Sequence, residues 1–86
     1  MLGDLASAQP YLERALAIRE TVPGPQHPDT ARSLNNLGFL LQAQGDLAGA
    51  RPYYERALAI LLLRLGPGHP DTQTVRRNLE ALGTTE

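Results

Sequence analysis

The sequence contains no cysteine. It therefore has no disulfide framework, no thiolate metal site and no cysteine nucleophile. An excess of charge is also missing, because 8 basic side chains and 9 acidic ones leave a net charge of −1 at pH 7. Such a chain has no broad positive field that would attract nucleic acid or an anionic bilayer. We therefore expect neither nucleic acid nor a membrane among its partners.

Long apolar runs are absent as well. The longest, residues 57–63, spans about seven residues, whereas about 20 are needed to cross the hydrocarbon of a bilayer. No basic region with a long apolar core follows Met1, so the N-terminus does not resemble a secretory signal. These absences predict a cytoplasmic protein with a single domain over residues 1–86, whose small size limits the core it can bury.

The sequence is one unit written twice. Residues 3–44 align with residues 45–86 without a gap, and about 22 of the 42 paired positions are identical. Both copies contain the segment Tyr-x-Glu-Arg-Ala-Leu-Ala-Ile, and His27-Pro-Asp-Thr30 returns as His69-Pro-Asp-Thr72. A period of about 42 residues is typical of solenoids, in which each repeat stacks on its neighbours to bury its apolar face.

Each unit has the apolar spacing of two amphipathic helices. Leu34, Leu37 and Leu41 fall on one helical stripe, and Tyr54, Ala57 and Leu61 fall on another. Proline and aspartate mark the helix starts, and glycine marks the stops. The sequence predicts an all-α fold of antiparallel helix-turn-helix repeats stacked as a short right-handed solenoid, with four helices at about 4–22, 29–44, 46–65 and 71–83.

The stretch Leu34-Asn-Asn-Leu-Gly-Phe-Leu-Leu41, with the Gly45-Asp46 turn and with Ala50, Tyr54 and Ala57 after it, resembles the signature of the tetratricopeptide repeat. The 42-residue spacing is similar to that of the long repeats in kinesin light chains and in bacterial sensor or scaffold proteins. This resemblance implies a noncatalytic module that binds a protein or peptide partner. A structural or self-assembling segment is the alternative.

No arrangement of residues in the sequence indicates catalysis, a metal or a cofactor. His27 with Asp29, and His69 with Asp71, lie beside helix-starting prolines, where hydrogen bonds within the loop explain them better than metal binding does. The glycines at 66 and 68 flank a proline, which lacks the N–H donor that a phosphate-binding loop uses. We therefore predict that the chain is not an enzyme.

By the same resemblance, polar positions on the first helix of each unit line a concave groove. The candidate groove residues are Arg32, Asn35, Asn36, Phe39, Gln42, Thr74, Arg77 and Asn78. Asn36 and Asn78 occupy the place where the family often has an asparagine that contacts a bound peptide. The lysine that completes a carboxylate clamp is replaced by Arg32 and Thr74. The alternative is that Asn36 only ties neighbouring helices together by hydrogen bonds.

Two further features suggest contact between chains. Leu61, Leu62 and Leu63 make the end of one helix apolar on every side, so they are candidates either for the core or for an oligomer interface. The helix after each His-Pro-Asp-Thr segment is called the first type (29–44 and 71–83), and the helix after each Gly-Asp pair is called the second type (4–22 and 46–65). The order second, first, second, first leaves an unpaired helix at each end. We therefore expect a homo-oligomer in which residues 71–83 pack near residues 4–22 of another copy, head to tail or as a reciprocal exchange.

Overall fold

The computed structural model describes residues 2–83, with side chains from residue 5 onward. Within this range the chain forms four α-helices, namely α1 (Leu2–Thr21), α2 (Pro28–Ala43), α3 (Leu47–Arg64) and α4 (Pro70–Gly83). The described part contains no strand. The all-α prediction is confirmed, and the predicted helix boundaries agree with the observed ones to within two residues.

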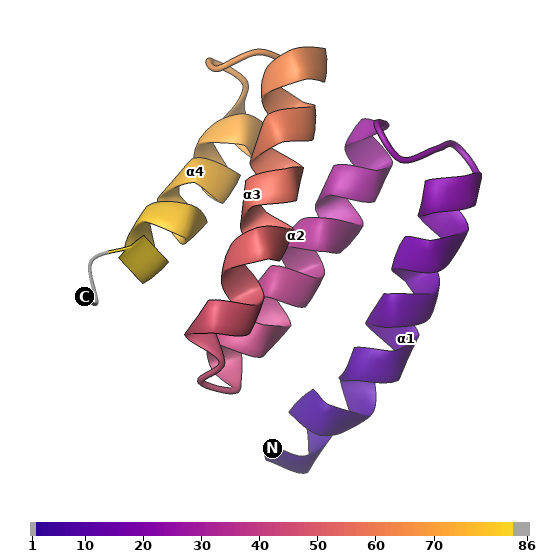
Figure 1. Cartoon of the computed structure of the whole chain (residues 1–86), viewed down its shortest axis with the longest axis vertical. Coiled ribbons are helices and arrows are strands. Elements are labelled where there is room, and N and C mark those ends of the chain that lie inside the picture. Colours follow the sequence, from indigo (N-terminus) through magenta and orange to yellow (C-terminus); the bar gives the residue numbers. More distant parts are fainter. Residues whose placement is uncertain (1, 84–86) are drawn as a thin grey trace.

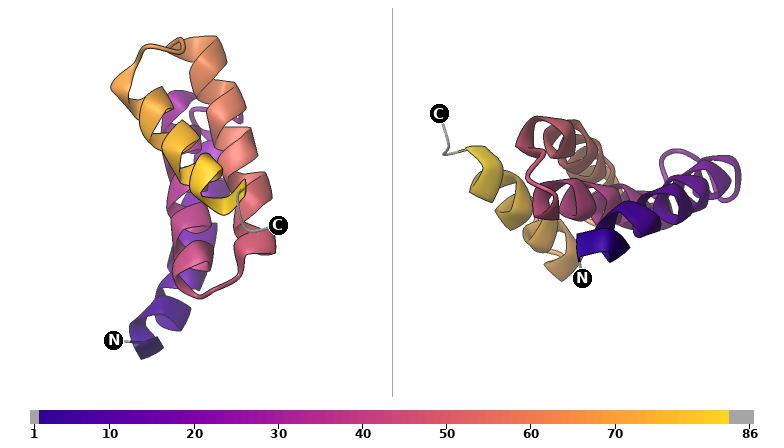
Figure 2. Two further views of the ribbon diagram at one scale, coloured as in Figure 1. Left: turned by 90° about the vertical axis from the view of Figure 1, so that its left-hand side faces the viewer. Right: turned by 90° about the horizontal axis from the view of Figure 1, so that it is seen from below.

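The helices follow one another as antiparallel neighbours. In Figure 1 they lie side by side in the order α4, α3, α2 and α1 across the molecule. The closest packing joins α2 to α3, while α1 packs on α2 and α4 packs on α3. Figure 2 shows that the helices do not form one flat layer, because α3 lies to one side of α2 when the molecule is seen from below. Residues 2–83 therefore contain one complete helical hairpin, α2 with α3, between two single helices.

The helix ends are formed by the residues that marked them in the sequence. The carboxylate of Asp46 accepts a hydrogen bond from the backbone N–H of Gly49 at 2.8 Å and caps α3. The Nδ1 atom of His27 accepts a hydrogen bond from the N–H of Asp29 at 3.0 Å and caps α2, and His69 bonds the N–H of Asp71 in the same way. The two histidines thus have a structural role at the loops.

The turn from α2 to α3 requires glycine. Gly45 has a φ of 87°, a left-handed conformation that side chains with a Cβ rarely adopt. Its N–H and that of Asp46 donate to the carbonyl oxygens of Gln42 and Leu41, which satisfies acceptors that the end of α2 leaves open. This turn fixes α3 antiparallel to α2.

The core lies mainly between α2 and α3. Its largest fully buried side chains include Leu34 and Leu37 from α2 and Tyr54 from α3. Gly38 of α2 faces the ring of Tyr54 so closely that a Cβ on Gly38 would lie 2.8 Å from two ring carbons. Ala50 and Ala57 are completely buried. Small residues at these positions allow the two helices to approach each other.

The threonine gives a physical reason why the His-Pro-Asp-Thr segment occurs in both units. The hydroxyl of Thr30 is buried and lies within hydrogen-bond distance of two carbonyl oxygens, that of Arg19 in the last turn of α1, at 3.1 Å, and that of Gly24 in the loop after α1. Thr72 is also buried, and its hydroxyl donates to the carbonyl of Leu61 near the end of α3 at 3.5 Å. In both units, the start of one helix is fastened to the end of the helix before it.

Candidate functional site

A hollow lies between α2 and α4, on the side predicted to form a groove. It has a volume of about 220 Å³ and is lined by Arg32, Asn35, Asn36, Leu61, Asp71, Thr74 and Val75. Leu61 and Val75 are buried and form its apolar floor, whereas the remaining lining residues are polar and reach solvent to different degrees. The structure therefore brings the central part of the predicted site together in one place.

Arg32 lies in the centre of a chain of charges along the rim of the hollow. Its guanidinium donates to Asp29 on the same helix at 2.6 Å and to Asp71 at the start of α4 at 3.0 Å. Arg19 of α1 approaches Asp29 at 4.0 Å. All these side chains are substantially exposed, so each pair contributes at most about 1 kcal/mol. The network positions Arg32 and joins three helices at their loop ends.

The two asparagines at equivalent positions have different surroundings. The side-chain amide of Asn78 donates to the Oδ1 atom of Asn35 at 3.0 Å and thereby ties α4 to α2. Asn36, the counterpart of Asn78 in the other unit, is exposed on α2. The hypothesis that an asparagine at this position links neighbouring first-type helices by a hydrogen bond therefore describes Asn78. Asn36 has its amide at the surface of the hollow.

The remaining predicted groove residues do not line the hollow. The ring of Phe39 is 62% exposed on α2. Arg77 is exposed on α4 and donates to the hydroxyl of Thr74 at 3.4 Å. Gln42 instead accepts a hydrogen bond from the Tyr54 hydroxyl at 2.7 Å, so its side chain serves the contact between α2 and α3.

The leucine run at the end of α3 divides between the core and the surface. Leu61 is only 1% exposed and belongs to the core, where it also forms part of the floor of the hollow. Leu62 and Leu63 are exposed, and Leu63 is the more exposed of the two at 69%. Surface contact through this run is therefore restricted to Leu62 and Leu63.

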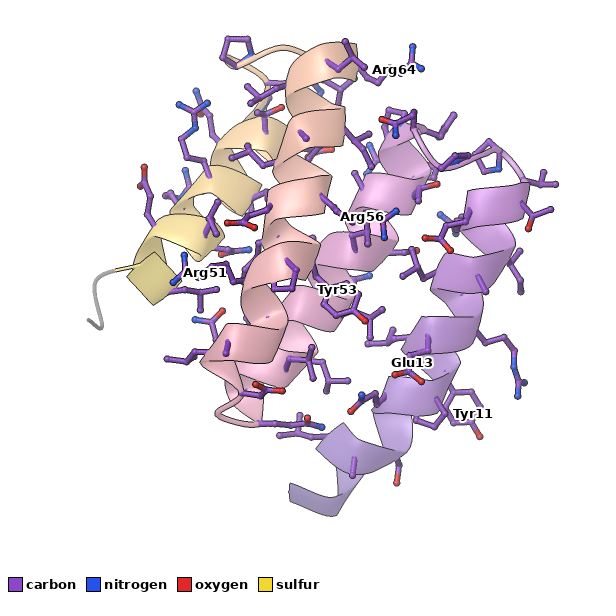
Figure 3. All side chains as sticks on the ribbon, in the orientation of Figure 1. Tyr11, Glu13, Arg51, Tyr53, Arg56 and Arg64 are labelled. Atoms are coloured by element: carbon purple, nitrogen blue, oxygen red, sulfur yellow. The ribbon has the colours of Figure 1, made fainter. Side chains whose placement is uncertain are left out.

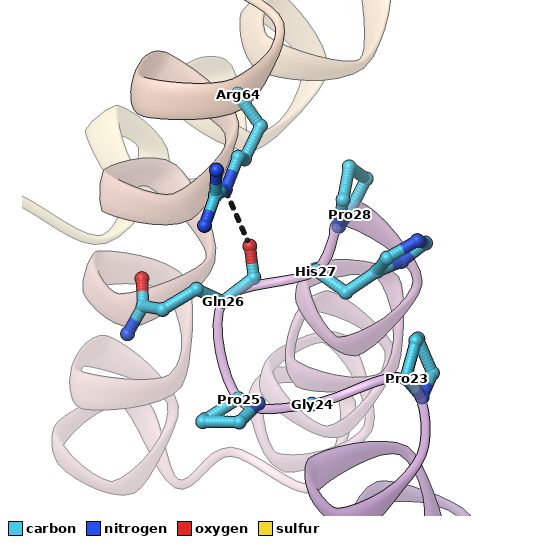
Figure 4. A pocket seen from close by; sticks show the side chains of 7 residues that line it. All are labelled: Pro23, Gly24, Pro25, Gln26, His27, Pro28 and Arg64. Atoms are coloured by element: carbon cyan, nitrogen blue, oxygen red, sulfur yellow. Dashed lines mark hydrogen bonds between the residues drawn. The ribbon is translucent and has the colours of Figure 1, made fainter.

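A second hollow of about 470 Å³ lies at the loop between α1 and α2 (Figure 4). Its lining is mostly loop proline and glycine, together with Gln26, His27 and Arg64. The Nε atom of Arg64 donates to the carbonyl oxygen of Gln26 at 3.1 Å, which ties the end of α3 to this loop. We attribute this hollow to the shape of the loop, because the close-up shows no set of polar side chains converging in it.

The described residues provide little for chemistry. Among residues 2–83, no three histidine, aspartate or glutamate side chains are grouped so that they could hold a metal ion. Burial raises the pKa of the Tyr54 hydroxyl, but this group lies in the core and not in the hollow. Within the same residues, no helix has the length and apolar character needed to cross a membrane.

Comparison with known proteins agrees with the repeat seen in the sequence and in the helices. A family model described as a tetratricopeptide repeat matches residues 1–63 and, in a second overlapping placement, residues 34–82. No match was found among curated proteins. Since the family model covers most of the chain and the observed fold consists of stacked antiparallel helices, the chain belongs to the tetratricopeptide repeat family.

Proposed function

We propose that the chain binds an extended peptide segment of a partner protein in the groove between α2 and α4. Tetratricopeptide repeats generally mediate contacts between proteins and are generally noncatalytic. The observation that carries the proposal is the hollow of about 220 Å³, in which an apolar floor is surrounded by the polar side chains of two first-type helices.

The side chains of the groove favour a peptide backbone over a free carboxylate. Arg32 is already paired with Asp29 and Asp71, so a carboxylate ligand would have to compete with two anions for the guanidinium. The exposed amide of Asn36 can donate to a peptide carbonyl and accept from a peptide N–H. The exposed ring of Phe39 offers an apolar contact for one ligand side chain.

A peptide selection tests this proposal. A library of random peptides displayed on phage is selected on the wild-type chain, and the enriched peptides are measured against Asn36→Ala and Thr74→Ala. Leu63→Ala serves as the control, because Leu63 is exposed and does not line the hollow. We expect affinity to fall about tenfold in the groove variants and to stay unchanged in the control. If the enriched peptides bind all variants equally, they do not occupy the groove.

A structural or self-assembling role is the second candidate, and the exposure of Leu62 and Leu63 favours it. This role predicts that the molar mass in solution rises over a hundredfold range of protein concentration, and that Leu63→Asp prevents the rise. Leu61 is unsuitable for this test, since a charge at a fully buried position would unfold the chain. A mass that stays monomeric over the whole range would exclude the self-assembling role.

We further propose that the chain acts in the cytoplasm and belongs to the subgroup with long, kinesin-light-chain-like repeats. Two observations support the subgroup: the repeat period of about 42 residues and the length of the second-type helix α3, which continues to Arg64. The parent assembly would then use these repeats as a scaffold. Detection of the chain in a cytosolic fraction, bound to other proteins, would support this role, and detection outside the cell would contradict it.

A further inference from the structure

The two second-type helices, α1 and α3, carry the same residues on one face but bury that face to different extents. The matched pairs are Ala8 with Ala50, Tyr11 with Tyr53, Ala15 with Ala57 and Ile18 with Ile60. On α3 the two alanines are completely buried, Ile60 is 3% exposed and Tyr53 packs against the core. On α1 Tyr11 is 70% exposed and Ile18 is 59% exposed. We call Ala8, Tyr11, Ala15 and Ile18 the outer face of α1.

Helix α2 is the helix that packs most closely on α3, so we infer that α2 covers this face of α3. Ala31, Leu34 and Leu41 are buried and share a helical face with Gly38, which lies against Tyr54 of α3. Figure 3 places Tyr53 on the side of α3 toward α2 and α1, whereas Tyr11 points away from the other helices. Within residues 2–83, the outer face of α1 is thus a largely uncovered copy of a surface that is buried on α3.

The helix α4 is also of the first type but lacks the residues needed to cover such a face. At its positions that match the α3-facing residues of α2, alanine is replaced by Gln73, Leu34 by Arg76 and Gly38 by Glu80. These three α4 side chains are exposed. Packing them on the outer face of α1 in a second copy would bury two charges, which is strongly unfavourable without partners. This argues against the head-to-tail contact expected from the sequence.

We propose that the outer face of α1 is a docking surface for an antiparallel helix of a partner protein, with the aliphatic pattern of α2. This partner helix carries small or aliphatic residues at the positions of Ala31, Leu34, Gly38 and Leu41. It packs on α1 as α2 packs on α3, and the interface continues the contact between α2 and α3 by one more repeat. This surface lies on α1, and the residue that it shares with the groove between α2 and α4 is Asn36 at its edge.

Two polar contacts inside the molecule indicate which polar contacts the docked helix would make at the edges of the interface. Asn78 donates to Asn35 on the preceding first-type helix, so its exposed counterpart Asn36 would donate to an amide at the same position of the docked helix. Arg56 of α3 donates to Glu20 of α1 at 3.1 Å. Arg14, the counterpart of Arg56, is exposed and would pair with an acidic residue on the second helix of a docked hairpin.

The chain supplies its own probe for a test. A labelled peptide with the sequence of residues 27–44 carries the α2 pattern, and a hydrocarbon staple between the positions of Arg32 and Asn36, on its outer side, reduces the entropy lost when it becomes helical. A stapled peptide with the sequence of residues 69–83 carries the α4 pattern and is the matched negative probe. Binding of both peptides to the wild-type chain is measured by fluorescence anisotropy.

We expect saturable binding of one α2-pattern peptide per chain and no comparable binding of the α4-pattern peptide. Ile18→Asp should weaken the α2-pattern peptide at least about tenfold, because it places a charge where an isoleucine would be buried. Leu63→Asp makes the same kind of change at an exposed leucine on α3 and should leave binding unchanged. Since Ile18 is exposed, circular dichroism should show that the Ile18→Asp chain stays folded.

Four results would overturn the proposal. The first is no binding of the stapled α2-pattern peptide. The second is binding that Ile18→Asp does not weaken, which would mean that the peptide displaces α2 from its own place. The third is equal binding of the α4-pattern peptide. The fourth is a wild-type dimer that Ile18→Asp converts to a monomer, because a second copy would then be the occupant of the outer face of α1.

Discussion

The contact between Gly38 and Tyr54 predicts that Gly38→Ala destabilises the chain, although alanine is the better helix former. The new Cβ would lie 2.8 Å from the Cδ1 and Cε1 atoms of the Tyr54 ring. That ring is fully buried, and its hydroxyl is held by Gln42 at 2.7 Å, so it has little freedom to move away. Such overpacking costs about 1–3 kcal/mol, whereas the gain in helix propensity is about 1 kcal/mol.

We expect a net loss of about 1 kcal/mol in the free energy of unfolding, which corresponds to a decrease of about 4–8 °C in Tm for a domain of this size. Thermal and urea unfolding followed by circular dichroism measure both quantities. Gly83→Ala in α4 is the matched control, because its Cβ would meet nothing closer than an Arg51 atom at 3.9 Å. This control should not lower Tm.

A second variant separates the steric effect from others. Position 54 is a tyrosine, whereas the matched position in the first unit is Leu12. In a Tyr54→Leu background the ring is absent, so the additional change Gly38→Ala should cost less than it does in the wild-type chain. A Tm that rises with Gly38→Ala alone, or a cost that is the same in both backgrounds, would refute the argument.

Three other predictions concern the threonine hydrogen bonds, the Tyr54 hydroxyl and the polar side of α4. Thr30→Val should lower the free energy of unfolding by about 1–2 kcal/mol in urea titrations and Thr72→Val by less, because the single hydrogen bond of Thr72 is 3.5 Å long. Since burial raises the pKa of Tyr54 above 10.0, its stabilising contribution is complete below the unfolded-state pKa and is lost as the pH rises through the folded-state value. Urea unfolding between pH 8 and about 11 should show this loss, and Tyr54→Phe should reduce it. Finally, the double change Arg76→Leu with Glu80→Gly should give α4 the character of α2, so that the molar mass in light scattering rises with concentration. A molar mass that stays constant would show that the polar side chains of Arg76 and Glu80 are not what prevents α4 from packing on α1 of a second copy.

Local signals made the helices predictable from the sequence. Helices α2 and α4 begin at Pro28 and Pro70, and the chain leaves α2 through Gly45 in a conformation that suits glycine. The repeat then indicated which helices are equivalent. These signals act over a few residues or compare one copy with the other, so they did not require knowledge of the tertiary packing.

The candidate site was less predictable, because helical periodicity gives the direction of a side chain but not the neighbour that it meets. Gln42 shares the polar side of α2 with the groove candidates, yet it bonds Tyr54 of α3. In the run Leu61 to Leu63, all residues are apolar, so only the packing shows that Leu61 is buried. The polar outer side of α4 was visible in the alignment of the two units, but as differences at Arg76 and Glu80 among many identities.

The two helices that form the walls of the groove differ in how they are packed. Helix α2 is packed between α1 and α3, whereas α4 packs chiefly on α3. Amide protons should therefore exchange slowly with solvent in α2 and faster in α4, where fewer contacts oppose local opening. A ligand that spans the groove would add contacts to α4, the less tightly packed of the two helices. Ligand binding should therefore slow amide-proton exchange most in α4.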